Sequence, residues 1–220
     1  MQDESSYWIQ SVSVVVTAEF HNPSILNPDF LRGQEIVPMS WKTAQQITTP
    51  QFSNLRFENG IDWTVDQSKL AVSENCESGD RNEYRTYGLV IEYLRKLPHV
   101  PYRNLGLNCV VAVRKQNPQR WLTQRFLRDG IWSHSGQTVF DMVPKFVIDP
   151  DGGPRYTLSL RAGKSKLGGE NAKPSVIADC NIHHQGPHNV DSLCRAINRW
   201  RERKEFVLVT LRGLLGDCQS

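Results

Sequence analysis

A pattern of short strands, an amphipathic helix and an apolar strand occurs twice along the chain, and it constrains the fold more than any other feature. The first copy predicts a helix over residues 84–97 and a strand over 105–113. The second predicts a helix over 190–204 and a strand over 206–211. Helices that return to a mostly antiparallel sheet in this way pack on one face of it. We therefore expect an α+β protein.

The two copies predict two ferredoxin-like halves, residues 1–116 and 117–220, packed as one compact unit. A short helix is expected within residues 117–130, with Gly130 as its C-cap, and the boundary lies at its start. No residue-level identity links the copies. Two unrelated α+β segments therefore stay open as an alternative.

Strand signals surround both helices. Residues 8–20 are rich in β-branched and aromatic side chains and predict a first strand. The other predicted strands are 52–57, 61–65, 69–73, 137–148, 155–160 and 175–182. Antiparallel strands of this kind suit a sheet that is covered on one face.

Local turn and cap signals refine this outline. Asn59-Gly60 lies between two apolar runs and predicts a hairpin whose two turn residues both take positive φ. Asn27 before Pro28 predicts the start of a short helix. Residues 35–49 are ambiguous, and Ser40 fits the cap of a short helix over 41–47. The Gly- and Lys-rich residues 163–174 are expected to form a mobile loop.

Composition indicates an ordinary globular protein with 39% hydrophobic and 22% charged residues. The net charge of +3 permits contact with nucleic acid but does not demand it. The five cysteines are odd in number and form no CxxC pair, which favours a reducing compartment. An acidic N-terminus and the lack of a long apolar run predict a cytoplasmic protein without membrane contact.

The densest polar segment is residues 179–188, which holds three of the six histidines. One interpretation is a metal site that combines Cys180 with His183 or His188. Another is acid–base catalysis by His183 or His184, with Lys164 or Lys166 stabilising an anionic transition state. The interpretation we favour is that the histidines end a strand and hydrogen-bond a turn. We predict no metal and no cofactor.

Two further groups of residues resemble known catalytic or nucleotide-binding motifs but lack the features that those motifs require. Residues 163–169 contain glycines and lysines but lack the GxxxxGK[ST] spacing of a phosphate loop, and no helix follows, so nucleotide binding is not predicted there. Ser133, His134, Asp149 and Asp151 have no nucleophile-elbow context, so we predict no hydrolase site from them.

Basic residues and tryptophans are the candidate binding residues. Arg195, Arg199 and Arg203 are four residues apart and predict one ridge on a helix, which suits a phosphate backbone. The alternative is a solvated helix face paired with nearby glutamates. Trp41 and Trp132 lie in segments of poor periodicity and are candidates for contact with a protein partner.

Three short stretches carry a resemblance. They are the valine-rich residues 12–20, Asn-Leu-Gly-Leu-Asn at 104–108, and Asp-Cys-Asn-Ile-His at 179–183 followed by a helix. The chain resembles a sporadically distributed, uncharacterised prokaryotic family found in mobile or phage-defence gene clusters. The resemblance implies a role in such a system, and it brings no catalytic residues with it.

The function expected from these features is a non-enzymatic binding or assembly subunit of a bacterial multi-protein system, with a protein partner. The alternative is an RNA-binding protein or a metal-free endoribonuclease of the CRISPR-processing type. That alternative would use Arg195, Arg199 and Arg203 with His183, His184 and Lys164. A third hypothesis is an inhibitor that blocks the site of another protein. The oligomeric state stays open.

Overall fold

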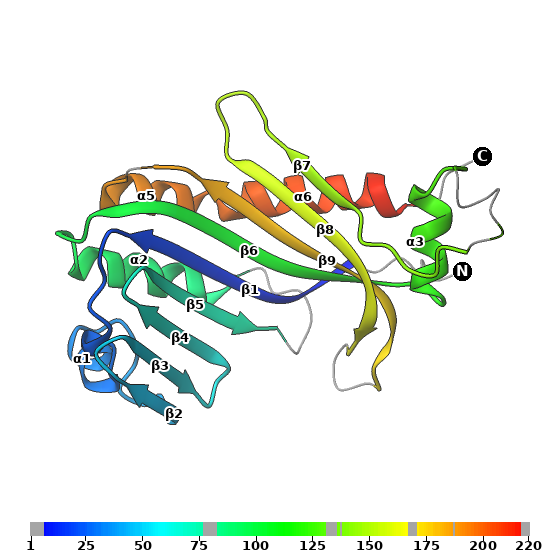
Figure 1. The fold of residues 1–220 in the computed structure, drawn as a ribbon. Helices are drawn as coiled ribbons and strands as arrows, with labels where there is room; N and C mark the ends of the chain where they lie inside the picture. Colours follow the sequence, from blue (N-terminus) through cyan, green and yellow to red (C-terminus); the bar gives the residue numbers. More distant parts are fainter. Residues whose placement is uncertain are drawn as a thin grey trace.

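The structure is a computed structural model that describes residues 7–76, 83–130, 136, 138–166, 171–186 and 188–216. Within these residues nine strands form one antiparallel sheet, in the order β2-β3-β4-β5-β1-β6-β9-β8-β7 (Figure 1). The strands are β1 (Tyr7–Ala18), β2 (Thr43–Thr48), β3 (Phe52–Phe57), β4 (Ile61–Asp66), β5 (Lys69–Asn75), β6 (Tyr102–Arg114), β7 (Lys145–Ile148), β8 (Arg155–Ser165) and β9 (Lys173–His184). The expected α+β class is confirmed.

Five helices accompany the sheet in the described part of the chain. They are α1 (Pro28–Gly33), α2 (Arg85–Lys96), α3 (Pro118–Phe126), α5 (Val190–Asn198) and α6 (Trp200–Leu215), and a short 3-10 turn η1 (Pro23–Ile25) precedes α1. Helices α2, α5 and α6 lie along one face of the sheet (Figure 1). The predicted helices at 84–97 and within 117–130 are confirmed as α2 and α3. Asn27 caps α1 as expected, because its side chain accepts a hydrogen bond from the backbone N–H of Phe30.

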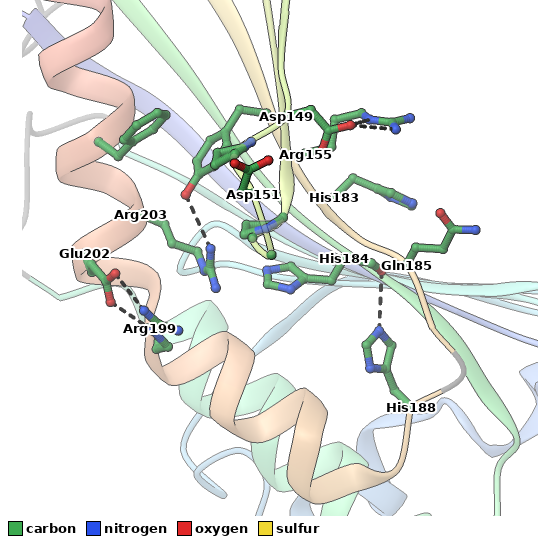
Figure 2. Close-up of a pocket in the computed structure, with 16 residues that line it drawn as sticks. Asp149, Asp151, Arg155, His183, His184, Gln185, His188, Arg199, Glu202 and Arg203 are labelled. Carbon is green, nitrogen blue, oxygen red and sulfur yellow. Dashed lines mark hydrogen bonds and ion pairs between the residues drawn. The ribbon is translucent and has the colours of Figure 1, made fainter.

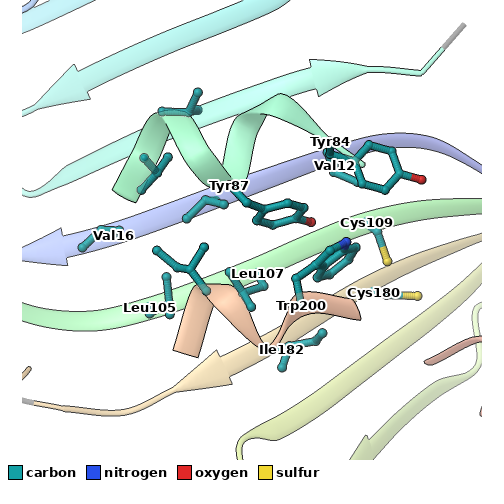
Figure 3. Close-up of a cluster of buried hydrophobic side chains, with 14 of the residues drawn as sticks. Val12, Val16, Tyr84, Tyr87, Leu105, Leu107, Cys109, Cys180, Ile182 and Trp200 are labelled. Atoms are coloured by element: carbon teal, nitrogen blue, oxygen red, sulfur yellow. The ribbon is translucent and has the colours of Figure 1, made fainter. Parts of the chain in front are cut away.

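The hydrophobic core lies between the sheet and these helices. Tyr87 of α2 stacks on Trp200 of α6 with ring centroids 4.7 Å apart, and both rings are buried. Figure 3 shows this pair in a cluster of buried side chains that includes Val12, Val16, Leu105, Leu107 and Ile182 of the sheet. The alternation of buried and exposed residues along each strand fixes which side chains reach this layer.

The opposite face of the sheet carries a row of polar side chains across its central strands. Asn181 of β9 donates a hydrogen bond of 2.6 Å to the side-chain oxygen of Asn108 on β6. Asn108 in turn donates to the hydroxyl of Ser13 on β1 at 3.2 Å. The same face also carries a small buried cluster of Trp8, Ala112 and Ile177, so it is polar in part only.

The hairpin predicted at Asn59-Gly60 joins β3 to β4, but its turn differs from the expected one. Gly60 has φ +85°, whereas Asn59 has an ordinary negative φ. The N–H of Gly60 bonds the carbonyl of Phe57 at 3.1 Å. The loop therefore has three residues with a left-handed glycine at its end, so only one position needs positive φ.

The strand predicted at 206–211 is wrong, because these residues lie inside helix α6. Val207, Leu208, Leu211 and Leu215 are buried, while Val209 is 55% exposed. A strand would have buried residues 207, 209 and 211 together, whereas a helix separates 209 from the others. The second copy thus has no closing strand, and two ferredoxin-like halves are not confirmed.

Four other expected segments also need correction. The expected helix at 41–47 is wrong: Thr43–Thr48 is strand β2, which takes its backbone hydrogen bonds from β3. Of the predicted strand 137–148, only Lys145–Ile148 pairs with β8. The predicted helix 190–204 is divided at Arg199 into α5 and α6. The expected mobile loop 163–174 begins and ends within strands β8 and β9, and residues 167–170 lie outside the described residues.

Strands β6 and β9 join the two predicted halves. They pair directly from Leu105 opposite His184 to Arg114 opposite Ser175. The sheet is therefore continuous across the expected boundary at residue 116. The division into an α+β half over 1–116 and another over 117–220, packed as one compact unit, stays a prediction.

Candidate functional site

A pocket of about 570 Å³ lies where three segments meet at one end of the sheet (Figure 2). Residues 149–154 connect β7 to β8 and form one wall. The end of β9, with residues 183–185 and His188, forms the second. The first turns of α6 form the third. A volume of this size is within the range of small-molecule sites.

The backbone of β8 and β9 determines which side chains enter the pocket. Arg155 lies opposite His183, and Tyr156 lies opposite Ile182. Because side chains alternate along a strand, His183 and Arg155 share the polar face of the sheet, while His184 and Tyr156 are on the helix-covered face. The turn before β8 is closed by a hydrogen bond of 3.0 Å from the N–H of Gly153 to the carbonyl of Pro150.

Arg203 is the most unusual residue of the pocket. Its side chain is in the first turn of α6, and the residue is only 6% exposed. One guanidinium nitrogen donates to the hydroxyl of Tyr156 at 3.3 Å, and Nε is buried without a hydrogen-bond partner. No ion pair joins Arg203 to a carboxylate of the described residues. Glu202 interacts electrostatically with Arg203 but forms no ion pair with it, and a buried charge without an ion pair is costly, so this guanidinium would gain from an anion.

His184 lies next to Arg203 in the pocket (Figure 2). Burial lowers the pKa of its imidazole to about 4, and the nearby charge of Arg203 adds to this effect. The ring is therefore neutral at pH 7, and its Nε2 is buried without a hydrogen-bond partner. A neutral imidazole beside a guanidinium can donate or accept a hydrogen bond without adding a charge.

The other arginines of the pocket have carboxylate partners. Arg155 bonds Asp149 at 2.9 Å, and Arg199 bonds Glu202 at 2.7 Å. All four of these side chains are more than half exposed, so water screens both pairs. The positive charge available to a ligand is therefore concentrated at Arg203.

The structure brings some of the expected catalytic residues together and separates others. His183 and His184 both line the pocket, but they project from opposite faces of β9. Lys164 is not near them, because it lies nine residues from Arg155 along β8, opposite Pro174. A joint acid–base role for the three residues therefore has no support in their geometry.

The expected arginine ridge is not continuous. Arg195 is exposed on α5, Arg199 lies at the junction between α5 and α6, and Arg203 is buried. Two of the three residues line the pocket instead of one exposed helix face. Whether any of them contacts nucleic acid stays a prediction.

Of the two tryptophans that are candidates for partner binding, the structure describes only one. Trp41 is half-buried and packs on Phe57 with ring centroids 5.2 Å apart, and the Arg85 guanidinium lies 5.5 Å from its ring. Trp132 lies outside the described residues. A role for either in contact with a protein partner stays a prediction.

One interpretation of the sequence combines Cys180 with His183 or His188 as metal ligands. Cys180 is buried on the helix-covered face, whereas His183 is on the other face. Across the part of the chain that the structure describes, no three His, Cys, Asp or Glu side chains lie close enough to hold a metal ion.

Among the described helices, none combines the length and apolar composition that crossing a membrane requires.

Comparison with known proteins adds no family. No family model matches the sequence, and no curated protein matches it. The resemblance to the prokaryotic family in defence clusters therefore stays a hypothesis.

Sequence reasoning missed the burial of Arg203 and the contributions of Tyr156 and Phe206. The sequence does contain a pattern that indicates the burial of Arg203. Trp200, Val207 and Leu211 are three of the buried residues of α6, and Arg203 lies on the stripe that they define. An arginine on an apolar stripe indicates a buried charge, but only a helix that continues past residue 204 shows the stripe.

Proposed function

We propose that the protein binds a small anionic ligand, one that carries a phosphate or carboxylate group, in the pocket beneath α6. The observation that carries this proposal is the buried guanidinium of Arg203, which hydrogen-bonds the neutral hydroxyl of Tyr156 and forms no ion pair with a carboxylate of the described residues. Arginine presents a planar set of donors that matches both kinds of anion.

His184 and Tyr156 support Arg203 in this role. The Tyr156 hydroxyl holds one guanidinium nitrogen at 3.3 Å, which orients the planar group. The imidazole Nε2 of His184 is a second hydrogen-bonding atom without a partner in the described structure. Both His184 Nε2 and Arg203 Nε are closed to water in this ligand-free structure, so the two side chains turn towards the pocket when they bind an anion. The hydrogen bonds then form in a partly desolvated place, where such bonds are stronger than in water.

Ligand binding is a function of the non-enzymatic class expected from the sequence. A protein partner, a role in phage defence and cytoplasmic location are compatible with it and stay hypotheses. The endoribonuclease alternative has less support, because His183 and His184 face opposite ways and Lys164 lies far along β8.

The test is calorimetric titration of the purified protein with inorganic phosphate, pyrophosphate and acetate. We expect saturable binding of at least one anion to the wild type and a loss of about tenfold or more in the Arg203→Met variant, since a charged hydrogen bond is removed. Arg195→Met is the matched control, because Arg195 is exposed on α5 and does not line the pocket.

Equal affinity in the wild type and Arg203→Met would overturn the proposal, and so would the absence of binding for all three anions. Circular dichroism of both variants shows whether the fold is retained. A loss of affinity in Arg195→Met as large as in Arg203→Met would instead indicate nonspecific attraction to a basic surface.

A further inference from the structure

An aromatic surface adjoins the anion-binding atoms in the pocket. Phe206 lines the pocket and is 39% exposed. Tyr156 packs behind it with ring centroids 4.4 Å apart and a 42° angle between the rings. The ring of Phe206 is therefore held in place while part of it stays open to a ligand.

The aromatic surface and the guanidinium are close together for a simple reason. Arg203 and Phe206 are three residues apart on α6, so their side chains are neighbours on the helix surface. Tyr156 contacts both, since its hydroxyl bonds Arg203 and its ring packs on Phe206. A ligand that fills the pocket would meet a charged group and a ring at the same time.

The rim of the pocket adds hydrogen-bond acceptors. The carboxylates of Asp151 and Glu202 line it, and no ion pair of Asp151 is found within the described residues. Carboxylates accept hydrogen bonds from hydroxyl and amino groups. They also disfavour a ligand that carries negative charge along its whole length.

We infer that the ligand is a nucleoside monophosphate, with its phosphate on Arg203 and His184 and its base against Phe206. A mononucleotide combines one anionic group, one planar ring and several hydroxyl or amino donors, and these match the guanidinium, the exposed ring and the rim carboxylates. This inference rests on the proposed anion binding, and it deepens it by naming the ligand class.

The experiment compares ligands that differ by one part. Wild-type protein is titrated calorimetrically with AMP, GMP, CMP, UMP, adenosine, inorganic phosphate and a 5′-phosphorylated RNA hexamer. We expect at least one mononucleotide to bind about tenfold or more tightly than phosphate or adenosine, because base stacking and phosphate contacts then act together. The hexamer is expected to bind no more tightly than that mononucleotide.

Two variants separate the parts of the site. Phe206→Leu should weaken mononucleotide binding about fivefold or more while leaving phosphate binding unchanged, since stacking is lost and the guanidinium stays. Unchanged phosphate binding also shows that the pocket is intact. Val209→Leu is the control, because Val209 is on the exposed side of the same helix and does not line the pocket.

The outcomes distinguish the two proposals. Phosphate and mononucleotides of equal affinity, with no effect of Phe206→Leu, would overturn the nucleotide inference and leave anion binding intact. A hexamer that binds much more tightly than any mononucleotide would overturn it in favour of a nucleic-acid strand. Lack of binding by phosphate and by all four nucleotides would overturn both proposals.

Discussion

Glu74 on strand β5 binds both the backbone and the side chain of Arg85, the first residue of helix α2, and so caps the start of this helix. The buried carboxylate accepts hydrogen bonds from the Arg85 backbone N–H at 2.8 Å and from its Nε at 2.9 Å. It also accepts from the backbone N–H and the hydroxyl of Thr86, each at 3.3 Å. Tyr84, at the N-cap position, provides no side-chain hydrogen bond, so a residue from the sheet does what a local cap does elsewhere.

The first prediction concerns this cap. Glu74→Gln should lower the free energy of unfolding by about 2 kcal/mol, because hydrogen bonds to a charged group are replaced and Arg85 loses its counter-charge. Urea denaturation measures the change. Glu205→Gln, in an exposed pair with Arg212, should change stability by less than about 0.5 kcal/mol. Equal effects of the two substitutions would contradict the role of Glu74.

The second prediction tests the helical state of residues 206–211. Leu211→Ala should cost about 2 to 4 kcal/mol, because Leu211 is fully buried, whereas Val209→Ala should cost well under about 1 kcal/mol. A strand would place both residues on the same face and make the two costs similar. Chemical denaturation of the two variants therefore separates helix from strand.

The third prediction concerns pH. The pKa of His184 is lowered to about 4, first by burial and then by Arg203, His188, His183 and Arg199. The unfolded chain takes up a proton near pH 6.5, before the folded protein does, so stability should fall as the pH falls from about 6.5 towards 4. His184→Gln should reduce this loss. His21 acts in the same direction, because burial also lowers its pKa, and subtraction of the two pH profiles removes its contribution. Parallel profiles in wild type and variant would contradict the assignment.

The fourth prediction uses two glycines. Gly88 is in α2 with open space around it, so Gly88→Ala should stabilise the protein by about 0.5 to 1 kcal/mol. Gly60 also has open space, but its φ is +85°, so Gly60→Ala should destabilise by about 1 kcal/mol or more. Thermal unfolding gives both signs, and the same sign for both would rule out the three-residue turn.

The fifth prediction concerns the ligand-free stability of the pocket. Arg203→Met should raise the free energy of unfolding by about 1 kcal/mol, because an apolar side chain of similar length replaces a buried charge that has no ion pair in the described structure. The same variant should lose anion binding. A clear fall in stability, measured without ligand in urea, would show that Tyr156 and the surrounding dipoles already satisfy the guanidinium.

Local patterns predicted most of the individual helices and strands, but not their arrangement in one nine-stranded sheet. Asn27-Pro28 marked the start of α1, the apolar stripe of α2 was visible, and the valine-rich first strand was found. Phe206-Val-Leu-Val-Thr-Leu was misjudged because β-branched residues favour strands, while packing against the core favoured the helix. Strand β2 was missed because an exposed edge strand has no hydrophobic alternation.

The pocket was harder to predict than the fold. Its walls come from residues 149–156, 183–188 and 199–206, and only the pairing of β8 with β9 brings the first two together. The sequence indicates His183 and His184 as candidate acid–base residues. Their side chains point in opposite directions because strand β9 extends to His184, and the sequence does not show that extension. Asp149 and Asp151, for which the sequence predicts no hydrolase role, line the rim of the pocket in the structure. Their position there depends on residues of β9 and α6 that are distant in the sequence.

The pairing of β6 with β9 has a consequence for synthesis on the ribosome. Strand β6 is finished at residue 114, and β9 does not begin until residue 173. For that interval the nascent chain carries a long strand with one side unpaired, and such an edge can recruit other chains. Conditions that slow translation between these two strands should therefore lower the yield of folded protein more than a pause after His184.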